Sequence, residues 1–417
     1  SMPKEFSHIK DIERYLLTLS KFSMVGAKAA NFSLKKVKNF LQELGNPHKN
    51  FPSIHVAGTN GKGTVCHLLE AIYRRAGYKT SLFTSPHLIS FNERFRILGK
   101  PISDKKLVAF FAQVSSLLDT YNLTYFELST VIAFTLFDHE FVDIAIIETG
   151  LGGRLDATNV LLPLLSVITS ISYDHTDILG EDLASIAWEK AGIIKKKVPC
   201  IVGKVPDEAY KVIEERAIKQ NAPLFEAEQL NPSFSKKNIT LSEPNITLKT
   251  SFFEPVNAWN VAMTYQSIQC LKDQLPVSEE DFIAAVEEFP GVPGRFERMH
   301  PTFAWYFSGS HNLEGITSTI RTVKSFKNKR KFIVMGMMKD KISKEILDET
   351  LGFADRFFYK LEGDRAASLA GIPSHLHMKA MNDGDVEYML SELKTSLVIF
   401  TGSFYFYSIV KDWMSRM

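Results

Sequence analysis

The stretch Ile54-His55-Val56-Ala57-Gly58-Thr59-Asn60-Gly61-Lys62-Gly63-Thr64 joins a short apolar run to residues 65–72, which have helical spacing. A strand, a glycine-rich turn and a helix are therefore expected to follow one another directly. This arrangement binds polyphosphate, because glycines let backbone N–H groups approach a phosphate closely and the helix start adds unpaired donors. The stretch predicts an α/β domain built around a nucleotide-binding loop.

The candidate nucleotide-binding residues form one unbroken segment: Gly58, Thr59, Asn60, Gly61, Lys62, Gly63 and Thr64. Lys62 can reach the terminal phosphates, and the Thr64 hydroxyl is the group that such loops place on Mg²⁺. The spacing differs from the common G-x-x-x-x-G-K-[ST] loop, because Gly63 separates Lys62 from Thr64. The alternative interpretation is a plain glycine turn at the end of a strand.

Apolar runs and helical segments continue to alternate along the chain. A helical region is expected over residues 9–45, and further strands are expected at 79–84, 143–148, 164–170 and 198–202. This alternation predicts a mostly parallel sheet covered by helices on both faces, with polar residues at the strand ends lining the ligand site. Residues 238–253 alternate around Ser242-Glu243-Pro244-Asn245 and predict a hairpin.

A linker and a second α/β region follow. Residues 290–294 read Pro-Gly-Val-Pro-Gly, and apolar runs come after them at 303–307, 331–335, 356–359 and 397–401. We therefore expect an α/β protein of two domains: a P-loop-containing N-terminal domain with a mostly parallel sheet, residues 2–296, and a smaller Rossmann-like C-terminal domain, residues 297–417. Polar groups at the strand ends of both domains predict a cleft that closes on its ligands.

The composition argues against several classes of protein. The 417 residues carry a net charge of +2, which does not favour a nucleic-acid-binding surface. No apolar run reaches the roughly 18 residues of a membrane span. Cys66, Cys200 and Cys270 are too widely spaced for a disulfide framework or a zinc site, which fits a reducing compartment. We expect a cytoplasmic monomer that acts on small molecules, with no nucleic-acid or membrane partner.

Single polar residues after other strands are candidates for metal or phosphate contact. Glu148 ends an apolar strand, where it is either a Mg²⁺ ligand or a solvated strand end. His175, flanked by two aspartates, is a candidate metal ligand or phosphate contact, although a lone histidine is more often structural. Arg295 is suited to bidentate phosphate binding or is a solvated linker residue. Lys190 is, by composition alone, a surface lysine.

Together these motifs resemble the folylpolyglutamate synthase and dihydrofolate synthase family, a branch of the Mur-ligase-like ATP-dependent amide ligases. The resemblance extends over nearly the whole chain, and the extra loop glycine is usual in this family. The motifs are His55-Val56-Ala57-Gly58-Thr59-Asn60-Gly61-Lys62-Gly63-Thr64, Thr84-Ser85-Pro86-His87-Leu88 with Phe91-Asn92-Glu93-Arg94, Glu148-Thr149-Gly150-Leu151-Gly152-Gly153-Arg154-Leu155-Asp156-Ala157-Thr158-Asn159, Asp174-His175, Glu189-Lys190-Ala191-Gly192-Ile193, Pro293-Gly294-Arg295-Phe296-Glu297 and His311-Asn312-Leu313-Glu314-Gly315.

The resemblance implies a ligase that uses ATP and Mg²⁺. ATP phosphorylates the carboxylate of a folate or of dihydropteroate, and the α-amine of L-glutamate then displaces phosphate to form an amide. A carboxylate is a poor electrophile, so phosphorylation supplies the leaving group. Such a site must neutralise phosphate charge, align the reactants and exclude water.

The resemblance also assigns roles to individual residues. The implied Mg²⁺ ligands are Thr64, Ser85, Glu148 and His175. The implied ATP contacts beyond the loop are Asn260, Arg295 and the position of Ser308. The implied catalytic residues are Lys62, His175, Lys190 and His311. Of these, Lys190 matches a lysine that is carbamylated in relatives, and His311 is expected near the incoming glutamate. The implied substrate contacts are Ser85, Pro86, His87, Arg94, Asp156, Asn159 and Asp340, the last paired with Lys341.

Two departures and two rival functions accompany this interpretation. Ser308 stands where the family usually has Asp, and Val256-Asn257 stands where a His-Gln pair usually precedes Asn260. Both bear on nucleotide affinity and rate, whereas the phosphate and Mg²⁺ residues are retained. The rivals are a Mur-type ligase acting on a peptidoglycan precursor and a degenerate homologue that binds ATP without turnover. The extra loop glycine and the Ser-Pro-His segment favour the folate reaction.

Overall fold

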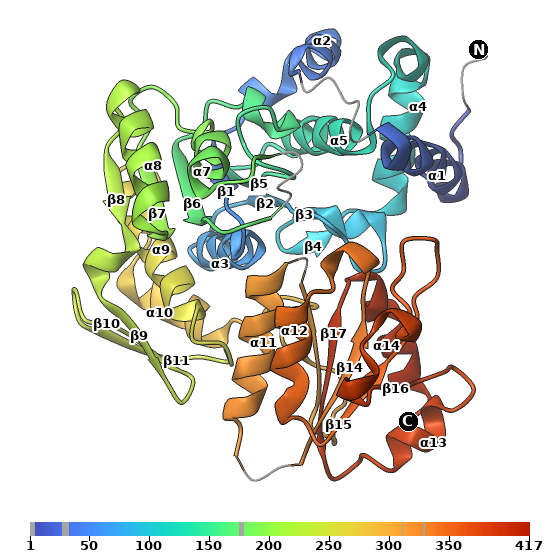
Figure 1. The fold of residues 1–417 in the computed structure, drawn as a ribbon. Helices are drawn as coiled ribbons and strands as arrows, with labels where there is room; N and C mark the ends of the chain where they lie inside the picture. Colours follow the sequence, from blue (N-terminus) through green and yellow to red (C-terminus); the bar gives the residue numbers. More distant parts are fainter. Residues whose placement is uncertain (1–4, 27–32, 175–178, 311, 328–329) are drawn as a thin grey trace. The chain divides into compact units, whose positions relative to one another are not determined.

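The computed structural model describes residues 5–26, 33–174, 179–310, 312–327 and 330–417 (Figure 1). The chain forms two compact units. The first comprises Ser1–Thr250 and Ala258–Phe289, and the second comprises Ser251–Asn257 and Pro290–Met417. Residues 290–296, which the sequence placed in the N-terminal domain, thus have most of their contacts with the second unit. None of the helices in these described ranges is long and apolar enough to cross a membrane.

The first unit is built on an eight-stranded sheet of order β4-β3-β2-β5-β1-β6-β7-β8. Its parallel strands are β2 (Thr80–Phe83), β5 (Ile144–Glu148), β1 (Ser53–Ala57), β6 (Leu165–Ser170), β7 (Cys200–Lys204) and β8 (Leu224–Glu226). Two short antiparallel strands, β3 (Phe95–Ile97) and β4 (Lys100–Pro101), extend one edge. The expected mostly parallel sheet is therefore confirmed, and the sequence missed β3, β4 and β8.

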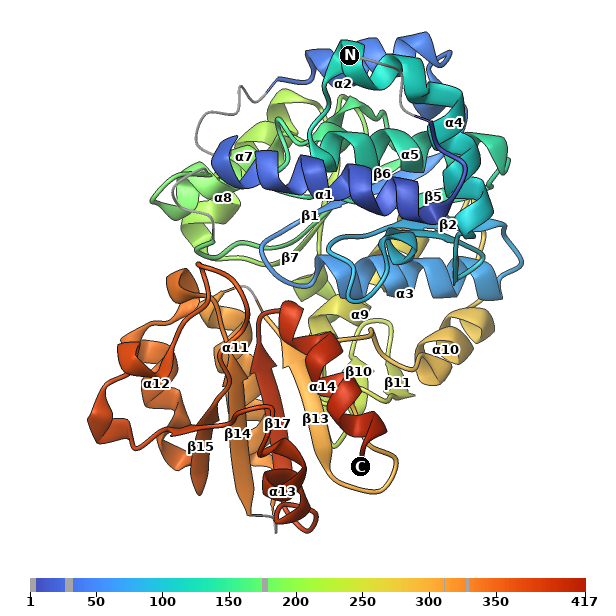
Figure 2. The same cartoon turned by 90° about the vertical axis from the view of Figure 1, so that its right-hand side faces the viewer.

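Helices cover both faces of this sheet (Figures 1 and 2). One face packs against α1 (Ile9–Gly26), α2 (Lys35–Glu43), α4 (Asp104–Tyr121), α5 (Tyr125–His139), α7 (Leu183–Ala191) and α8 (Asp207–Lys219), and the other packs against α3 (Lys62–Arg75), with α9 (Asn257–Cys270) and α10 (Glu279–Glu288) beside it. β1 and β5 are buried at every position, as central parallel strands require. The rigid sheet fixes the ends of these strands in space.

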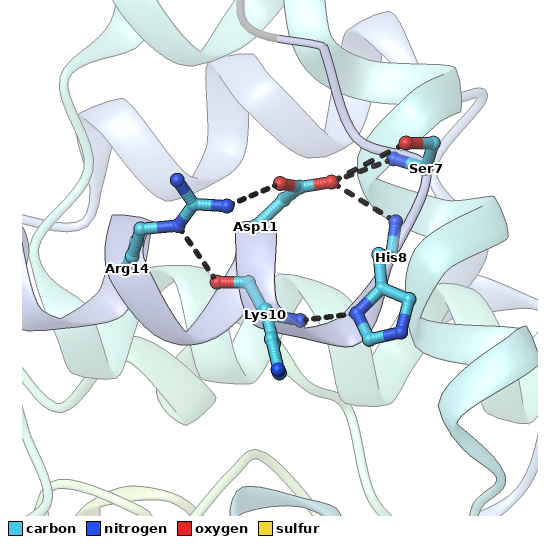
Figure 3. Close-up of polar contacts among 5 residues, drawn as sticks. All are labelled: Ser7, His8, Lys10, Asp11 and Arg14. Atoms are coloured by element: carbon cyan, nitrogen blue, oxygen red, sulfur yellow. Dashed lines mark hydrogen bonds and ion pairs between the residues drawn. The ribbon is translucent and has the colours of Figure 1, made fainter.

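Helix α1 begins with a reciprocal hydrogen-bonded cap (Figure 3). The Asp11 carboxylate accepts the backbone N–H groups of Ser7 and His8 at 3.1 and 3.0 Å, and His8 Nδ1 accepts the N–H of Lys10 at 3.1 Å. These side chains satisfy donors that the first turn of a helix leaves open. The expected helical region at residues 9–45 is thus represented by two helices, α1 and α2, and residues 27–32 between them lie outside the described part.

A small antiparallel sheet lies near the end of the first unit. Strands β10 (Asn238–Leu241) and β11 (Ile246–Lys249) form the expected hairpin, and β9 (Pro232–Ser235) pairs with the other edge of β10. The hairpin is confirmed, whereas the third strand was not predicted.

The second unit has a six-stranded sheet of order β12-β13-β17-β14-β15-β16. The parallel strands are β13 (Trp305–Gly309), β17 (Leu397–Gly402), β14 (Lys331–Gly336), β15 (Asp355–Phe358) and β16 (Lys379–Ala380), and β12 (Glu297–Arg298) is antiparallel to β13. Its helices are α11 (Leu313–Ser325), α12 (Lys344–Glu349), α13 (Val386–Ser391) and α14 (Tyr405–Ser415), with α11 and α14 on opposite faces (Figures 1 and 2). The expected second α/β unit is confirmed; β12 and β16 were missed.

Candidate active site

The strand register of the first unit gathers four loops at one edge of the sheet. Val56 in β1 lies beside Glu148 in β5, and Phe83 in β2 lies beside Ile147. On its other side, β1 places Ala57 next to Ile168 of β6. The residues that follow β1, β2, β5 and β6 therefore converge, as expected for the carboxyl ends of parallel strands.

Two glycines of the loop after β1 have backbone conformations that side chains rarely adopt. Gly58 has φ of +151°, and a Cβ added there would lie 1.9 Å from Thr169 Oγ1. Gly61 has φ of +89° and directly precedes α3; its added Cβ would lie 2.9 Å from Asn260 Oδ1. Glycine at these positions thus allows a close approach that any other residue would block. Asn260, a predicted ATP contact, is brought next to the loop.

The loop is held from β6 by two residues that sequence reasoning did not single out. Ser170 accepts the Thr59 N–H at its carbonyl (2.9 Å) and the Asn60 N–H at its hydroxyl (2.9 Å). Thr169 Oγ1 donates to the Asn60 carbonyl at 2.6 Å. These bonds fix the loop before any ligand arrives, and the N–H groups of the first turn of α3 then lie beside it.

Lys62 and Glu148 face the same small volume. Lys62 Nζ donates to the Thr149 carbonyl at 3.3 Å. Glu148 is 4% exposed; its Oε1 accepts the Ser85 N–H at 2.7 Å, and its Oε2 would lie 3.5 Å from a Cβ on Gly63. The structure therefore brings together the phosphate loop, Glu148 and Ser85.

The oxygen donors at this point fit a hard cation. A buried carboxylate with one oxygen turned toward the helix start, together with a threonine hydroxyl in the first turn of α3, is the donor type that Mg²⁺ prefers. Among the residues that the structure describes, no group of three or more His, Cys, Asp and Glu side chains could hold a metal. His175, a predicted ligand, lies outside the described residues.

Lys190 is buried, which corrects the interpretation of it as a surface lysine. It lies near the end of α7 and is 3% exposed. Burial lowers the pKa of Lys190 to about 7, and the charge of Lys62 acts in the same direction. A large fraction of its side chains therefore carries a neutral amine near neutral pH.

The motif that follows Glu148 is fixed by Asp156. Its Oδ1 accepts the N–H groups of Gly150 at 2.9 Å and Leu151 at 2.8 Å, while Oδ2 accepts from Thr158. Burial raises the pKa of Asp156, and hydrogen bonds from Thr158 and Leu151 oppose this. Asn159 Nδ2 donates to the carbonyls of Arg154 and Gly192, so that this motif is tied to the segment following Lys190.

The segment after β2 is also preorganised. Glu93 accepts backbone N–H groups of Leu88, Ile89 and Ser90 at 2.6–3.2 Å. Arg94 Nε donates to His87 Nδ1 at 2.8 Å, and the guanidinium lies 5.0 Å from the ring centre of Tyr125. Burial lowers the pKa of His87 to about 4, so it is neutral and can accept this bond.

In the second unit, the predicted residues are placed as follows. Arg295 donates to the Gly309 carbonyl at 3.3 Å and stacks on Phe404, and Ser308 Oγ accepts the Phe296 N–H at 3.0 Å. Ser308 thus holds the backbone next to Arg295. Asp340 is largely exposed, 3.9 Å from Arg365. His311 lies outside the described residues.

Comparisons with known proteins find relatives that cover most of the chain. The Mur ligase middle domain family matches residues 56–264. The chain is 34% identical to the dihydrofolate synthase/folylpolyglutamate synthase of Bacillus subtilis strain 168 over 406 residues, which cover 91% of this chain and 94% of that protein. The chain belongs to the folylpolyglutamate synthase/dihydrofolate synthase family.

Other members of this family are equally similar. The Escherichia coli K12 dihydrofolate synthase/folylpolyglutamate synthase is 35% identical over 86% of this chain and 84% of its own length. The structure of E. coli FolC in complex with DHPP and ADP superposes with a TM-score of 0.85 at 31% identity, over 100% of this chain and 99% of that one. The bifunctional folylpolyglutamate synthase/dihydrofolate synthase of Yersinia pestis CO92 gives 0.85 at 30%, over 99% and 100%. Family membership therefore rests on both sequence and fold.

Proposed function

We propose that this chain joins L-glutamate to the carboxylate of a folate or of dihydropteroate, with ATP converted to ADP and phosphate. The observation that carries the proposal is the pairing of the β1–α3 loop with a buried Glu148, in a chain of this family. The relatives are named for the two ligase activities, and the E. coli structure contains ADP.

The loop binds the phosphates of ATP. Its conformation is fixed by Thr169 and Ser170, so the backbone donors at the start of α3 need little reorganisation when a phosphate arrives. Lys62 then exchanges its contact with the Thr149 carbonyl for a contact with a terminal phosphate. Asn260, whose Oδ1 lies close to Gly61 of the loop, is a further nucleotide contact in this proposal, and Arg295 is another expected one.

Thr64 and Glu148 would hold one Mg²⁺, and Ser85, Glu148 and His175 would serve a second. When bound, the cation neutralises phosphate charge and so makes the γ-phosphorus more accessible to the carboxylate oxygen. Glu148 is well suited because burial strengthens its attraction for a cation, and the Ser85 N–H fixes one of its oxygens.

In the proposed reaction, a carboxylate oxygen of the folate attacks the γ-phosphorus and ADP leaves. The neutral α-amine of glutamate then attacks the acyl carbon, the amide forms, and phosphate departs with that carboxylate oxygen. The chain's residues orient the reactants and exclude water, because hydrolysis would destroy the acyl phosphate. His311 is expected near the incoming glutamate, with Asp340 and Lys341 nearby.

Lys190 reacts with CO₂ to form a carbamate. Its neutral amine attacks the carbon of CO₂ and loses a proton, which replaces a cation by an anionic oxygen donor. The buried position and lowered pKa of Lys190 support this step, because the amine must be unprotonated to react. The carbamate oxygens would serve as anionic donors to a metal or to the acyl phosphate.

The pterin and the benzoate of the folate bind between two preorganised segments. One is Ser85–Arg94, with Pro86, His87 and Arg94, and the other is the motif containing Asp156 and Asn159. Asp156 is committed to backbone N–H groups of its own motif, so we expect it to shape the substrate loop more than to contact the substrate.

The decisive experiment measures ADP release with dihydropteroate and then with tetrahydrofolate, each with and without L-glutamate and Mg²⁺. We expect release to require an acid, glutamate and the metal together, and mass spectrometry to find the product heavier by one glutamyl group. A UDP-linked muramoyl substrate serves as the control for a Mur-type ligase. ADP release without any amide product would contradict the proposal.

A further inference from the structure

His55 is a buried polar residue at the centre of the sheet, on the strand that leads into the phosphate loop. It lies in β1 between β5 and β6 and is fully buried. The positions on either side of it, Ile54 and Val56, are apolar. Burying an imidazole costs free energy unless hydrogen bonds compensate, so its partners should explain its presence.

Those partners form a chain of hydrogen bonds toward the loop after β5. His55 Nε2 lies 2.7 Å from Thr158 Oγ1, and Thr158 Oγ1 in turn donates to Asp156 Oδ2. Asp156 Oδ1 accepts the N–H groups of Gly150 and Leu151. The imidazole is therefore linked through two side chains to the backbone just beyond Glu148.

The protons available to the Thr158 hydroxyl and to the imidazole ring determine which tautomer His55 adopts. The Thr158 hydroxyl has one proton and donates it to the Asp156 carboxylate, so it must accept a proton from His55 Nε2. Burial lowers the pKa of His55 well below neutrality, to about 3, which leaves a single ring proton. Nδ1 is then a bare nitrogen, and no partner for it exists among the residues that the structure describes.

The far end of this chain meets Lys62. The Thr149 carbonyl, directly before Gly150, accepts Lys62 Nζ at 3.3 Å, and the Thr149 N–H donates to the Val56 carbonyl at 2.9 Å. Two contacts thus hold the peptide on which Lys62 rests: a direct one from β1 and an indirect one from His55.

We propose that His55 is a positioning residue for glutamate ligation, whose Nε2–H aligns Thr158 and Asp156 and thereby fixes the Thr149–Leu151 backbone under Lys62 and beside Glu148. The inference rests on the proposed function, because its consequence is a rate. The amides that hold ATP before reaction are fixed separately, by Thr169 and Ser170. Loss of His55 therefore lowers kcat much more than it raises KM for ATP.

The kinetic test compares three substitutions at one position. His55→Leu removes the donor, His55→Asn presents an amide donor nearer the backbone, and His55→Gln presents one close to the place of Nε2. We expect kcat to fall about 10- to 100-fold in H55L and H55N, with KM for ATP within about 3-fold, because a displacement of about 1 Å can cost that much rate. H55Q should retain kcat within about 3-fold.

Thr158→Val and His48→Leu are the matched controls. T158V should lower kcat as much as H55L, and the double variant should lose no more than either single one, since both break the same chain. His48 is another buried histidine, stacked on Phe134, with no place in this chain. H48L should lose thermal stability but keep kcat. Equal kcat losses in H48L and H55L, or a kcat of H55L within 2-fold of the unaltered protein, would overturn the proposal.

A spectroscopic readout separates this inference from the proposed function. In protein with ¹⁵N-labelled histidine rings, His55 should give a protonated Nε2 and an unprotonated Nδ1 at neutral pH. This pair of signals should vanish in H55Q, and the Nε2–H signal should shift in T158V. A protonated Nδ1 would overturn the inference even if the ligase activity is found. The predicted tautomer in a protein without ligase activity would contradict the proposed function and, with it, the role of His55 in the rate.

Discussion

Lys62 is the residue whose loss we expect to affect the reaction most. Its Nζ donates to the Thr149 carbonyl at 3.3 Å, beside the loop that we propose binds phosphate. Lys62→Met should lower kcat about 100-fold or more, which corresponds to about 2.7 kcal/mol of transition-state stabilisation. Lys100→Met, at an exposed strand end, is the control. Steady-state ADP release measures both; a K62M variant as active as K100M would contradict the assignment.

Lys190 should make activity depend on CO₂ and on pH. Its folded pKa of about 7 lies below the ordinary value of 10.5, so the reactive neutral amine gains population as pH rises through 7. In CO₂-depleted buffer we expect activity to fall, and bicarbonate to restore it more completely at pH 8 than at pH 6. Lys190→Ala should lose at least about 100-fold in kcat and regain part of it with acetate. Full activity of K190A without any additive would remove the carbamate from the account.

The same lowered pKa affects stability. Below about pH 7 both states of Lys190 are protonated and the folded state must bury the charge, so the destabilisation is largest there; between about 7 and 10.5 the unfolded chain binds a proton that the folded protein does not. Stability should therefore increase as pH rises between about 7 and 10.5, and K190A should flatten this part of the curve. Thermal unfolding at pH 7, 8 and 9 in CO₂-depleted buffer measures the effect, because a carbamate on Lys190 would abolish this titration. An identical slope in K190A would show that another group causes it.

At the residue scale, sequence prediction names candidates where spacing suggests a chemistry, and the roles of those candidates stay predictions. The order glycine, lysine, threonine after a strand identified Lys62, and an acid at a strand end identified Glu148. Sequence prediction missed residues whose contacts depend on how distant segments pack together. Thr169 and Ser170 support the loop only because β6 pairs with β1 in one register. The burial of Lys190 depends on the packing of α7, which a lone lysine does not reveal.

At the scale of elements, Gly58 sets the shape of the β1–α3 turn. Gly58→Ala would combine a strained φ with a Cβ only 1.9 Å from Thr169 Oγ1. We expect a loss of about 2–4 kcal/mol in stability and a large loss of ATP affinity. Gly77→Ala is the matched control, because it has φ of +97° but nothing within 4 Å of its added Cβ. Denaturant unfolding should show G77A losing only about 1–2 kcal/mol. Equal losses would mean that strain alone, without the clash, explains Gly58.

The cap of α1 gives an element-scale prediction about pH. Hydrogen bonds from the Ser7 and His8 backbone lower the pKa of Asp11 below 3.8, so the cap stabilises the helix above the unfolded pKa and loses this effect as pH falls through the folded one. Asp11→Asn should lower the melting temperature at pH 7. The difference in melting temperature between D11N and the unaltered protein should be smaller at pH 3 than at pH 7. Arg14→Gln should have a smaller effect, because its ion pair is exposed. A D11N protein with an unchanged melting temperature at pH 7 would contradict the cap.

Element prediction from sequence depended on length. Runs of five or six apolar residues, such as those of β5 and β17, were located to within a residue or two. The two-residue strands β4, β12 and β16 carry too few side chains to show a period. They form because a neighbouring strand has unpaired backbone hydrogen-bonding groups along its edge. Such pairing depends on the folded sheet and not on the local sequence.

At the scale of the whole molecule, two α/β units of unequal size were predicted from the repeated alternation of strands and helices. The boundary was harder, because Ser251–Asn257 belongs to the second unit although residues 258–289 return to the first. The aromatic ring of Phe253 packs on Phe296, Tyr306 and Phe326, which explains the assignment. When a short segment packs in a later domain and the chain then continues in the earlier one, the amino-acid composition does not change at the crossing.

The whole chain is expected to act as a monomer, since both units and all proposed residues come from one polypeptide. Sedimentation velocity with and without ADP should give a single species near the 47.1 kDa of the chain. A species of twice this mass, with or without ADP, would contradict the expectation of a monomer.

The transfer of a carboxylate oxygen to phosphate tests the central claim most directly. Dihydropteroate labelled with ¹⁸O in its carboxyl group, incubated with ATP, Mg²⁺ and L-glutamate, should yield inorganic phosphate that carries one ¹⁸O atom, detected by ³¹P NMR. That result would show that the terminal phosphoryl group of ATP becomes bonded to the acid before the amide forms. Amide product accompanied by unlabelled phosphate would contradict the account.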